Sequence, residues 1–89
     1  MTFEEDVRNL KGRIREAIYE GKAIIFFDDY LSFFRNRTGS ISSSTYYFAS
    51  YISATRLSIY FRPTCWDIKK RELIGELKKY IQENGGNVL

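Results

Sequence analysis

Two adjacent acids, Asp28 and Asp29, follow the most hydrophobic run of the chain, residues 23–27. Carboxylates at the end of a buried strand are suited to holding a metal ion that assists hydrolysis. Neighbouring residues of a strand point to opposite faces, however, so these two side chains cannot easily share one ion. Carboxylates also accept hydrogen bonds from the free backbone N–H groups of a following turn or helix. We therefore expect both acids to be structural, and we expect no metal and no cofactor.

Residue types that usually support catalysis are scarce. The chain has no histidine and one cysteine, Cys65. Catalytic triads that need an imidazole and metal sites built from histidine and cysteine are therefore excluded. Cys65 has no histidine to activate it, and we expect it to fill space in the core. A lone cysteine forms no internal disulfide, as is usual in the cytoplasm. The chain is predicted not to be an enzyme.

Basic side chains give the clearest indication of binding. The net charge is +3, and most of the excess base lies in the second half of the chain, where residues 69–71 are consecutively basic. Such a surface attracts phosphate groups or an acidic protein surface. Tyr46, Tyr47 and Tyr60 offer stacking surfaces if they are exposed. The residues predicted to bind are Arg35, Arg37, Arg56, Arg62, Lys69, Lys70 and Arg71.

The spacing of apolar residues predicts the elements that must position these side chains. A helix is expected to begin after Thr2, which can cap it together with Glu5, and to end at Gly21. Residues 22–27 form a continuous apolar run, typical of a strand buried on both faces. Residues 36–44 read as a loop. Residues 56–61 alternate between apolar and polar and predict a second strand that Pro63 ends.

Two interpretations are open for residues 44–54. As a helix, the segment begins at Ser43 or Ser44 and places Tyr47, Phe48 and Tyr51 on one face. As a strand, its Thr and Tyr content is favourable, but its alternation is poor. We favour the helix.

A strong helix is expected near the C-terminus. Thr64 is its predicted cap, and Trp66, Leu73 and Leu77 lie on its apolar stripe. Gly85 and Gly86 end it, and residues 85–89 are expected to form a loose C-terminal tail.

These elements predict a single domain, residues 1–89, of the α/β class. A short sheet is flanked by an N-terminal and a C-terminal helix, in the order helix–strand–helix–strand–helix, with the two strands parallel. If residues 44–54 are a strand, the order becomes helix, three strands, helix. The domain is then α+β with an antiparallel sheet.

Residues 22–76 resemble the second half of the core of additional-strand P-loop ATPases, which viruses and plasmids use to pack or move DNA. The resemblance rests on an apolar strand ending in Asp28 and Asp29, a serine-started segment, and the stretch TRLSIYFRPTCWDIKKREL. It implies that the two acids match the Walker B acids and that Arg56 matches the arginine before the next strand. Arg62 or Thr64 would fall in the sensor region. The phosphate-binding loop G-x-x-x-x-G-K-[ST] is missing, so the resemblance implies a relative that has lost ATP hydrolysis.

The sequence therefore predicts a small non-enzymatic binding protein, from a virus or mobile element. Its basic aromatic face would bind nucleic acid or a protein that it inhibits. The alternative is a degenerate ATPase-like subunit that lends acids or an arginine to a partner's nucleotide site. No apolar run approaches the roughly 20 residues of a membrane span, so we expect a soluble, cytoplasmic protein. Unpaired edges of a small sheet make a homodimer plausible.

Overall fold

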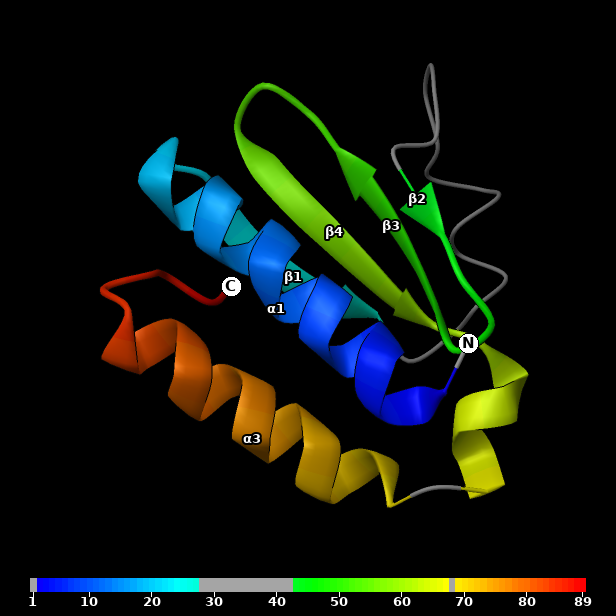
Figure 1. Cartoon of the computed structure of the whole chain (residues 1–89). Coiled ribbons are helices and arrows are strands. Elements are labelled where there is room, and N and C mark those ends of the chain that lie inside the picture. The colour runs from blue at the N-terminus through cyan, green and yellow to red at the C-terminus, as the bar shows by residue number, and fades with distance from the viewer. Residues whose placement is uncertain (1, 28–42, 68) are drawn as a thin grey trace.

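A mixed sheet backed by two long helices forms the described part of the chain (Figure 1). The computed structural model describes residues 2–27, 43–67 and 69–89. The elements are α1 (Phe3–Tyr19), β1 (Ala23–Phe27), β2 (Ser43–Ser44), β3 (Phe48–Ile52), β4 (Arg56–Phe61), the 3-10 helix η1 (Pro63–Asp67) and α3 (Lys70–Glu83).

Helix α1 forms where its sequence predicts it. The Thr2 hydroxyl accepts a hydrogen bond of 3.2 Å from the N–H of Glu5, which satisfies one of the free donors of the first turn. Three acids follow in that turn, where the helix dipole favours negative charge. Gly21 ends the helix with a φ of 75°, a conformation that glycine adopts without a steric penalty.

The sheet has the strand order β1-β4-β3-β2. Strands β1 and β4 are parallel, as predicted, with Ala23 opposite Arg56 and Phe27 opposite Tyr60. Strand β3 pairs antiparallel with β4 on one side and with the two-residue β2 on the other. The fold is therefore a small α+β domain. It confirms the alternative with three main strands, although the sheet is mixed and not antiparallel.

The prediction of a helix over residues 44–54 is wrong, because β3 occupies 48–52. Along β3 the apolar residues alternate between two clusters. Phe48 and Ile52 contact the core beneath the helices, whereas Ala49 and Tyr51 contact Tyr60 on the other face. Both faces of this strand are thus apolar. This removes the polar–apolar alternation that identifies a strand in a sequence.

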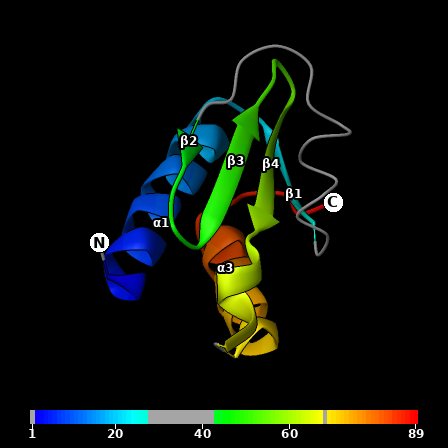
Figure 2. The ribbon, with the colours of Figure 1, turned by 90° about the vertical axis from the view of Figure 1, so that its right-hand side faces the viewer.

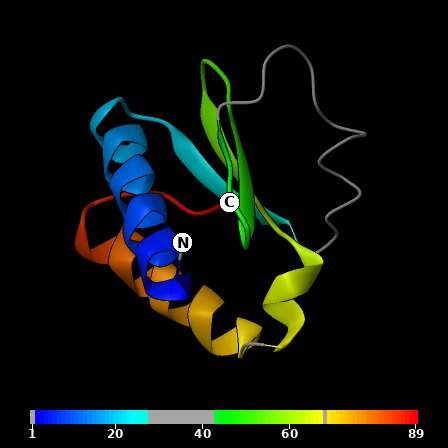
Figure 3. The ribbon, with the colours of Figure 1, turned by 45° about the vertical axis from the view of Figure 1, so that its right-hand side comes forward.

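Both helices cover the same face of the sheet, which leaves β3 and β4 with a second face turned away from them (Figure 3). The main core lies between these layers. It combines residues of α1, α3 and the strands: Leu10, Ile14, Ala17, Ile24, Phe48, Leu57, Ile59, Phe61, Leu73, Leu77 and Ile81. The contribution of Leu73 and Leu77 confirms the apolar stripe predicted for the last helix.

The last helix begins later than predicted. Thr64 does not cap it. Residues Pro63–Asp67 form η1, and α3 starts only at Lys70. The reason is tertiary: the Thr64 hydroxyl donates a 2.7 Å hydrogen bond to the carbonyl of Tyr46, and the Cys65 thiol donates to the carbonyl of Tyr47 at 2.9 Å. These bonds hold η1 against the turn between β2 and β3.

The predicted loose tail over residues 85–89 is instead hydrogen-bonded to β1. The N–H of Ile24 donates a hydrogen bond to the backbone carbonyl of Asn87 at 2.9 Å, and the N–H of Leu89 donates one to the carbonyl of Ile24 at 2.8 Å. Val88 thereby forms a parallel bridge beside Ile24. At Gly86 the chain passes close to Ile18 and Ile81, whose side-chain carbons would lie 2.7 Å from an added Cβ. Glycine at this position therefore allows the chain to turn back along the outer edge of β1.

Candidate nucleic-acid interface

The predicted basic residues that the structure describes lie at two ends of the sheet. Arg35 and Arg37 lie outside the described residues. Arg56 begins β4 and Arg62 directly follows its end. At about 3.3 Å per strand residue, these two positions are separated by roughly the whole strand, about 20 Å. The structure therefore places Arg56 at the opposite end of the sheet from Arg62.

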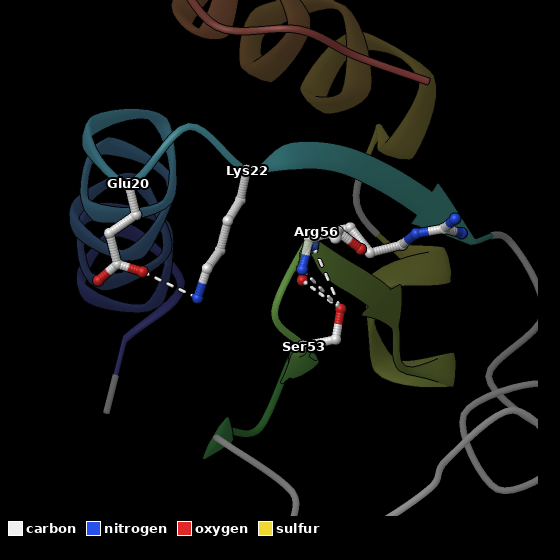
Figure 4. Close-up of polar contacts among 5 residues, drawn as sticks. Glu20, Lys22, Ser53 and Arg56 are labelled. Atoms are coloured by element: carbon white, nitrogen blue, oxygen red, sulfur yellow. Dashed lines mark hydrogen bonds and ion pairs between the residues drawn. The ribbon is translucent and has the colours of Figure 1, made fainter.

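The end of the sheet that carries Arg56 is built around a tight turn (Figure 4). The Ser53 hydroxyl accepts a 3.2 Å hydrogen bond from the Arg56 N–H and donates to its carbonyl at 3.3 Å. Lys22, also at this end, is neutralised by Glu20 at 2.8 Å. With Lys22 paired to Glu20, the exposed Arg56 is the predicted binding residue at this end.

At the other end of the sheet, four of the predicted residues follow closely in sequence: Arg62, Lys69, Lys70 and Arg71. We call these four residues the basic surface. Lys69 and Arg71 are exposed, and Lys70 lies with its ammonium 5.5 Å from the centre of the Phe61 ring. Arg62 is half-buried and donates to the Ser44 hydroxyl at 2.8 Å and to the Thr45 carbonyl at 3.2 Å. Arg62 therefore also fixes the β2–β3 turn to the end of β4.

Two exposed aromatic side chains, Tyr46 and Trp66, belong to this end of the molecule. Tyr46 is 62% exposed and Trp66 is 68% exposed. Figures 1 and 2 show η1, which carries Trp66, beside the turn that carries Tyr46. The hydrogen bonds from Thr64 and Cys65 to the carbonyls of residues 46 and 47 join the two segments. We call Tyr46 and Trp66 the aromatic pair.

The exposure of Trp66 differs from the sequence prediction, which placed it on the apolar stripe of the last helix. Because η1 is tied to the turn through Thr64 and the buried Cys65, the next side chain is turned outward. Of the tyrosines considered for stacking, Tyr46 is exposed. Tyr60 is 2% exposed and stacks on Phe27 with the ring centres 4.6 Å apart. Tyr60 is therefore not available to a ligand.

The turn is also anchored to α1. Asp6 is 1% exposed, and its Oδ2 accepts a 3.3 Å hydrogen bond from the N–H of Tyr47. The Tyr47 ring packs edge-on against Phe3, with ring centres 5.1 Å apart, and against Tyr46 at 4.9 Å. Sequence reasoning missed this role of Asp6, since an acid in a first helical turn is usually solvated. The backbone under Tyr46 is thus held from both α1 and η1.

The start of α3 is electrostatically unusual. Lys69 occupies the N-cap position and its side chain makes no capping hydrogen bond. Three cations thus lie where the free backbone N–H groups already create a positive field, which disfavours the helix. Glu72 approaches Lys69 at 3.8 Å, but both side chains are exposed, so the pair is weak and offsets the charge of Lys69 only slightly.

Acids limit this surface on the side of α1. Glu4 and Glu5 are exposed in its first turn, directly after Phe3, which packs against Tyr47. A polyanion would be repelled there and attracted towards Trp66 and the start of α3.

The environment of Cys65 disfavours its reactive thiolate form. Burial raises the pKa of the Cys65 thiol to about 11, and the positive charge of Lys70 opposes this only in part. The thiol therefore stays protonated near neutral pH, and its burial confirms the predicted core role. Within 2–27, 43–67 and 69–89, acidic, cysteine and histidine side chains nowhere gather in a group that could hold a metal ion.

Of the positions implied by the ATPase resemblance, the structure describes Arg56, Arg62 and Thr64. Asp28 and Asp29 lie outside the described residues. Arg56 and Arg62 lie at opposite ends of β4, and the Thr64 hydroxyl is hydrogen-bonded to the carbonyl of Tyr46 in the β2–β3 turn. The resemblance stays a prediction.

A recess of about 620 Å³ lies elsewhere, beside the second half of α1 and the end of α3. Its lining includes Arg15, Glu16 and Glu20, whose mixed charges favour neither an anion nor a cation. No helix in the described part of the chain is long and apolar enough to cross a membrane. Comparisons with protein-family models, with curated proteins and with solved structures found no significant match.

Proposed function

We propose that this chain is a non-enzymatic protein that binds nucleic acid through the basic surface. The observation that carries the proposal is that two kinds of exposed side chain belong to neighbouring segments at one end of the sheet: Lys69 and Arg71 at the start of α3, and the aromatic pair on η1 and the β2–β3 turn. Cations bind phosphates and release counterions, and rings stack on bases. Neither kind of contact needs a catalytic group.

The position of the cations supports a role in binding. Lysines at a helix start weaken the helix by about 0.3–1 kcal/mol each at low salt. The same positive charges would stabilise α3 if they lay at its C-terminal end. Their position at the N-terminal end therefore lowers the stability of the fold. A bound phosphate would reverse this effect, because it would be attracted both by the side chains and by the free N–H groups.

The test is a titration of labelled nucleic acid, followed by fluorescence anisotropy at 50 and 200 mM salt. With about three phosphate contacts, the affinity should fall on the order of tenfold to fiftyfold between these concentrations. Absence of binding at 50 mM salt would refute the proposal, and an acidic protein partner would then be sought.

A matched pair of variants identifies the surface. The double change Lys69→Glu with Arg71→Glu reverses two exposed charges at the start of α3, and Lys78→Glu with Lys79→Glu reverses two exposed charges in its second half. The first variant should lose binding, and the second should keep most of it. Equal losses would show that net charge, and not this surface, determines binding.

A further inference from the structure

We infer that the bound nucleic acid is single-stranded and that one of its bases stacks on Trp66. This inference rests on the proposed function and specifies its ligand. Trp66 is the only tryptophan of the chain, and it is 68% exposed although a large ring gains most from burial. Its neighbour Cys65 is fully buried. The indole is therefore presented to solvent by a backbone that is fixed on its other side.

The support beneath the aromatic pair favours stacking. Thr64 and Cys65 are bonded to the carbonyls of residues 46 and 47 at 2.7 and 2.9 Å. The Tyr46 ring rests edge-on against Tyr47, with an interplanar angle of 88°. The Tyr46 ring and the backbone that carries Trp66 are therefore held before a base is added, so less of the stacking free energy is offset by ordering them.

The form of the nucleic acid follows from what a ring can reach. In a duplex the base faces are covered by neighbouring base pairs, whereas an unpaired base offers its whole face to a ring. Cations next to exposed rings therefore fit a single strand, whose phosphates can follow Lys69 and Arg71 while a base lies on the indole. A duplex would use the cations alone.

Exposure of a ring is not by itself sufficient for nucleic-acid binding, and Tyr19 serves as a control for this point. Tyr19 is 93% exposed at the far end of α1. Its nearest charges on the same helix are mixed, and it lies about 24 Å along α1 from Phe3, the residue that packs against Tyr47. The nearby Arg15 is accompanied by Glu16 and Glu20, so Tyr19 has no cluster of cations beside it and should not contribute.

The experiment uses the intrinsic fluorescence of Trp66 in the full chain, titrated with a 12-nucleotide oligothymidine and with a 12-base-pair duplex. Stacking predicts quenching by the single strand and tighter binding of it than of the duplex. Trp66→Ala should weaken single-strand binding on the order of fivefold to a hundredfold, and Trp66→Phe, which keeps a ring, should weaken it less. Tyr19→Ala should change nothing, and circular dichroism checks that each variant folds.

The outcomes separate this inference from the proposed function. If duplex and single strand bind equally and Trp66→Ala has no effect, the stacking inference is refuted. If Lys69→Glu with Arg71→Glu still removes binding in that case, the basic surface stands as the interface. If no nucleic acid binds at 50 mM salt, both the proposed function and the inference fail.

Discussion

Replacing Lys69 by aspartate should raise stability and lower affinity at the same time. Lys69 is the N-cap of α3, has no capping hydrogen bond, and places a cation at the positive end of the helix dipole. Asp is a favoured N-cap residue, and an Asp cap is typically worth about 0.5–2 kcal/mol. Replacing a cation by an anion at this end adds about 0.3–1 kcal/mol for each of the two charge changes.

Two effects reduce this gain. The backbone of Lys69, with φ −68° and ψ 74°, is not in the extended conformation usual for a capping residue, so the lower end of the capping range applies. The pair between Lys69 and Glu72 is lost and replaced by repulsion, which costs a few tenths of a kcal/mol because both side chains are exposed. We expect a net gain of about 1 kcal/mol in the free energy of unfolding. For a domain of this size, the gain corresponds to about 4–8 °C in Tm.

The same substitution removes a phosphate contact, so the slope of log affinity against log salt should fall by about one. Stability is measured by urea unfolding followed by circular dichroism, and affinity by anisotropy. Lys79→Asp is the matched control, since Lys79 is exposed in the second half of the same helix. It should cost a few tenths of a kcal/mol through helix propensity and leave the affinity unchanged.

Either of two results would contradict this reasoning. If Lys69→Asp lowers the stability, the charge of Lys69 stabilises the start of α3 and is not tolerated there for binding. If the variant keeps full affinity and its salt slope, Lys69 does not contact phosphate.

Four further substitutions test the fold that positions the surface. Gly86→Ala should lower the free energy of unfolding by about 1–3 kcal/mol, because its Cβ would approach the side chains of two isoleucines at 2.7 Å. Gly75→Ala, in open space within α3, should raise the free energy of unfolding by about 0.5–1 kcal/mol. Urea unfolding measures both, and changes of the same sign would contradict the packing described. Asp6→Ala leaves the N–H of Tyr47 without its acceptor and should lower the free energy of unfolding by about 1–3 kcal/mol. If only the fold is affected, the variant should bind nucleic acid normally at a low temperature at which it is folded. Burial raises the pKa of the Cys65 thiol from 9.0 to about 11 in the folded chain. The contribution of this shift to stability is therefore fully present below pH 9 and is lost as the pH rises towards 11. Cys65→Ala should remove that part of the pH dependence, and the native thiol should resist alkylation at pH 8; rapid labelling of folded protein would contradict its burial.

Local signals made α1 and β1 predictable from the sequence. The Thr2 cap, the spacing of apolar residues and Gly21 all act within a few positions of one another, and the run before Asp28 is too short and too apolar for an exposed helix. In these regions local preference and the final fold agree.

Elements that depend on distant partners could not be predicted in the same way. Strand β3 has apolar residues on both faces, and Tyr47, Phe48 and Tyr51 also fit one face of a helix. Only its pairing with β4 decides between the two structures. The delayed start of α3 likewise depends on the bonds from Thr64 and Cys65 to a turn far away in the sequence.

The candidate site was predictable in part. Three consecutive cations, residues 69–71, indicate a basic surface in any fold. The separation of Arg56 from Arg62 follows from the length of the strand between them, which their spacing in the sequence already indicates. The aromatic pair was not predictable, because the exposure of Trp66 depends on where α3 begins and on how η1 is anchored.

The pairing of the tail with β1 also determines the order in which the chain can fold. Helix α1 forms from local contacts, but β1 needs β4 on one side and residues 87–89 on the other. Closing such long loops costs entropy before the contacts repay it, which slows folding. During synthesis, the outer edge of β1 therefore stays unpaired until residues 87–89 can reach it. In that interval, neighbouring nascent chains compete with the tail for the edge of β1.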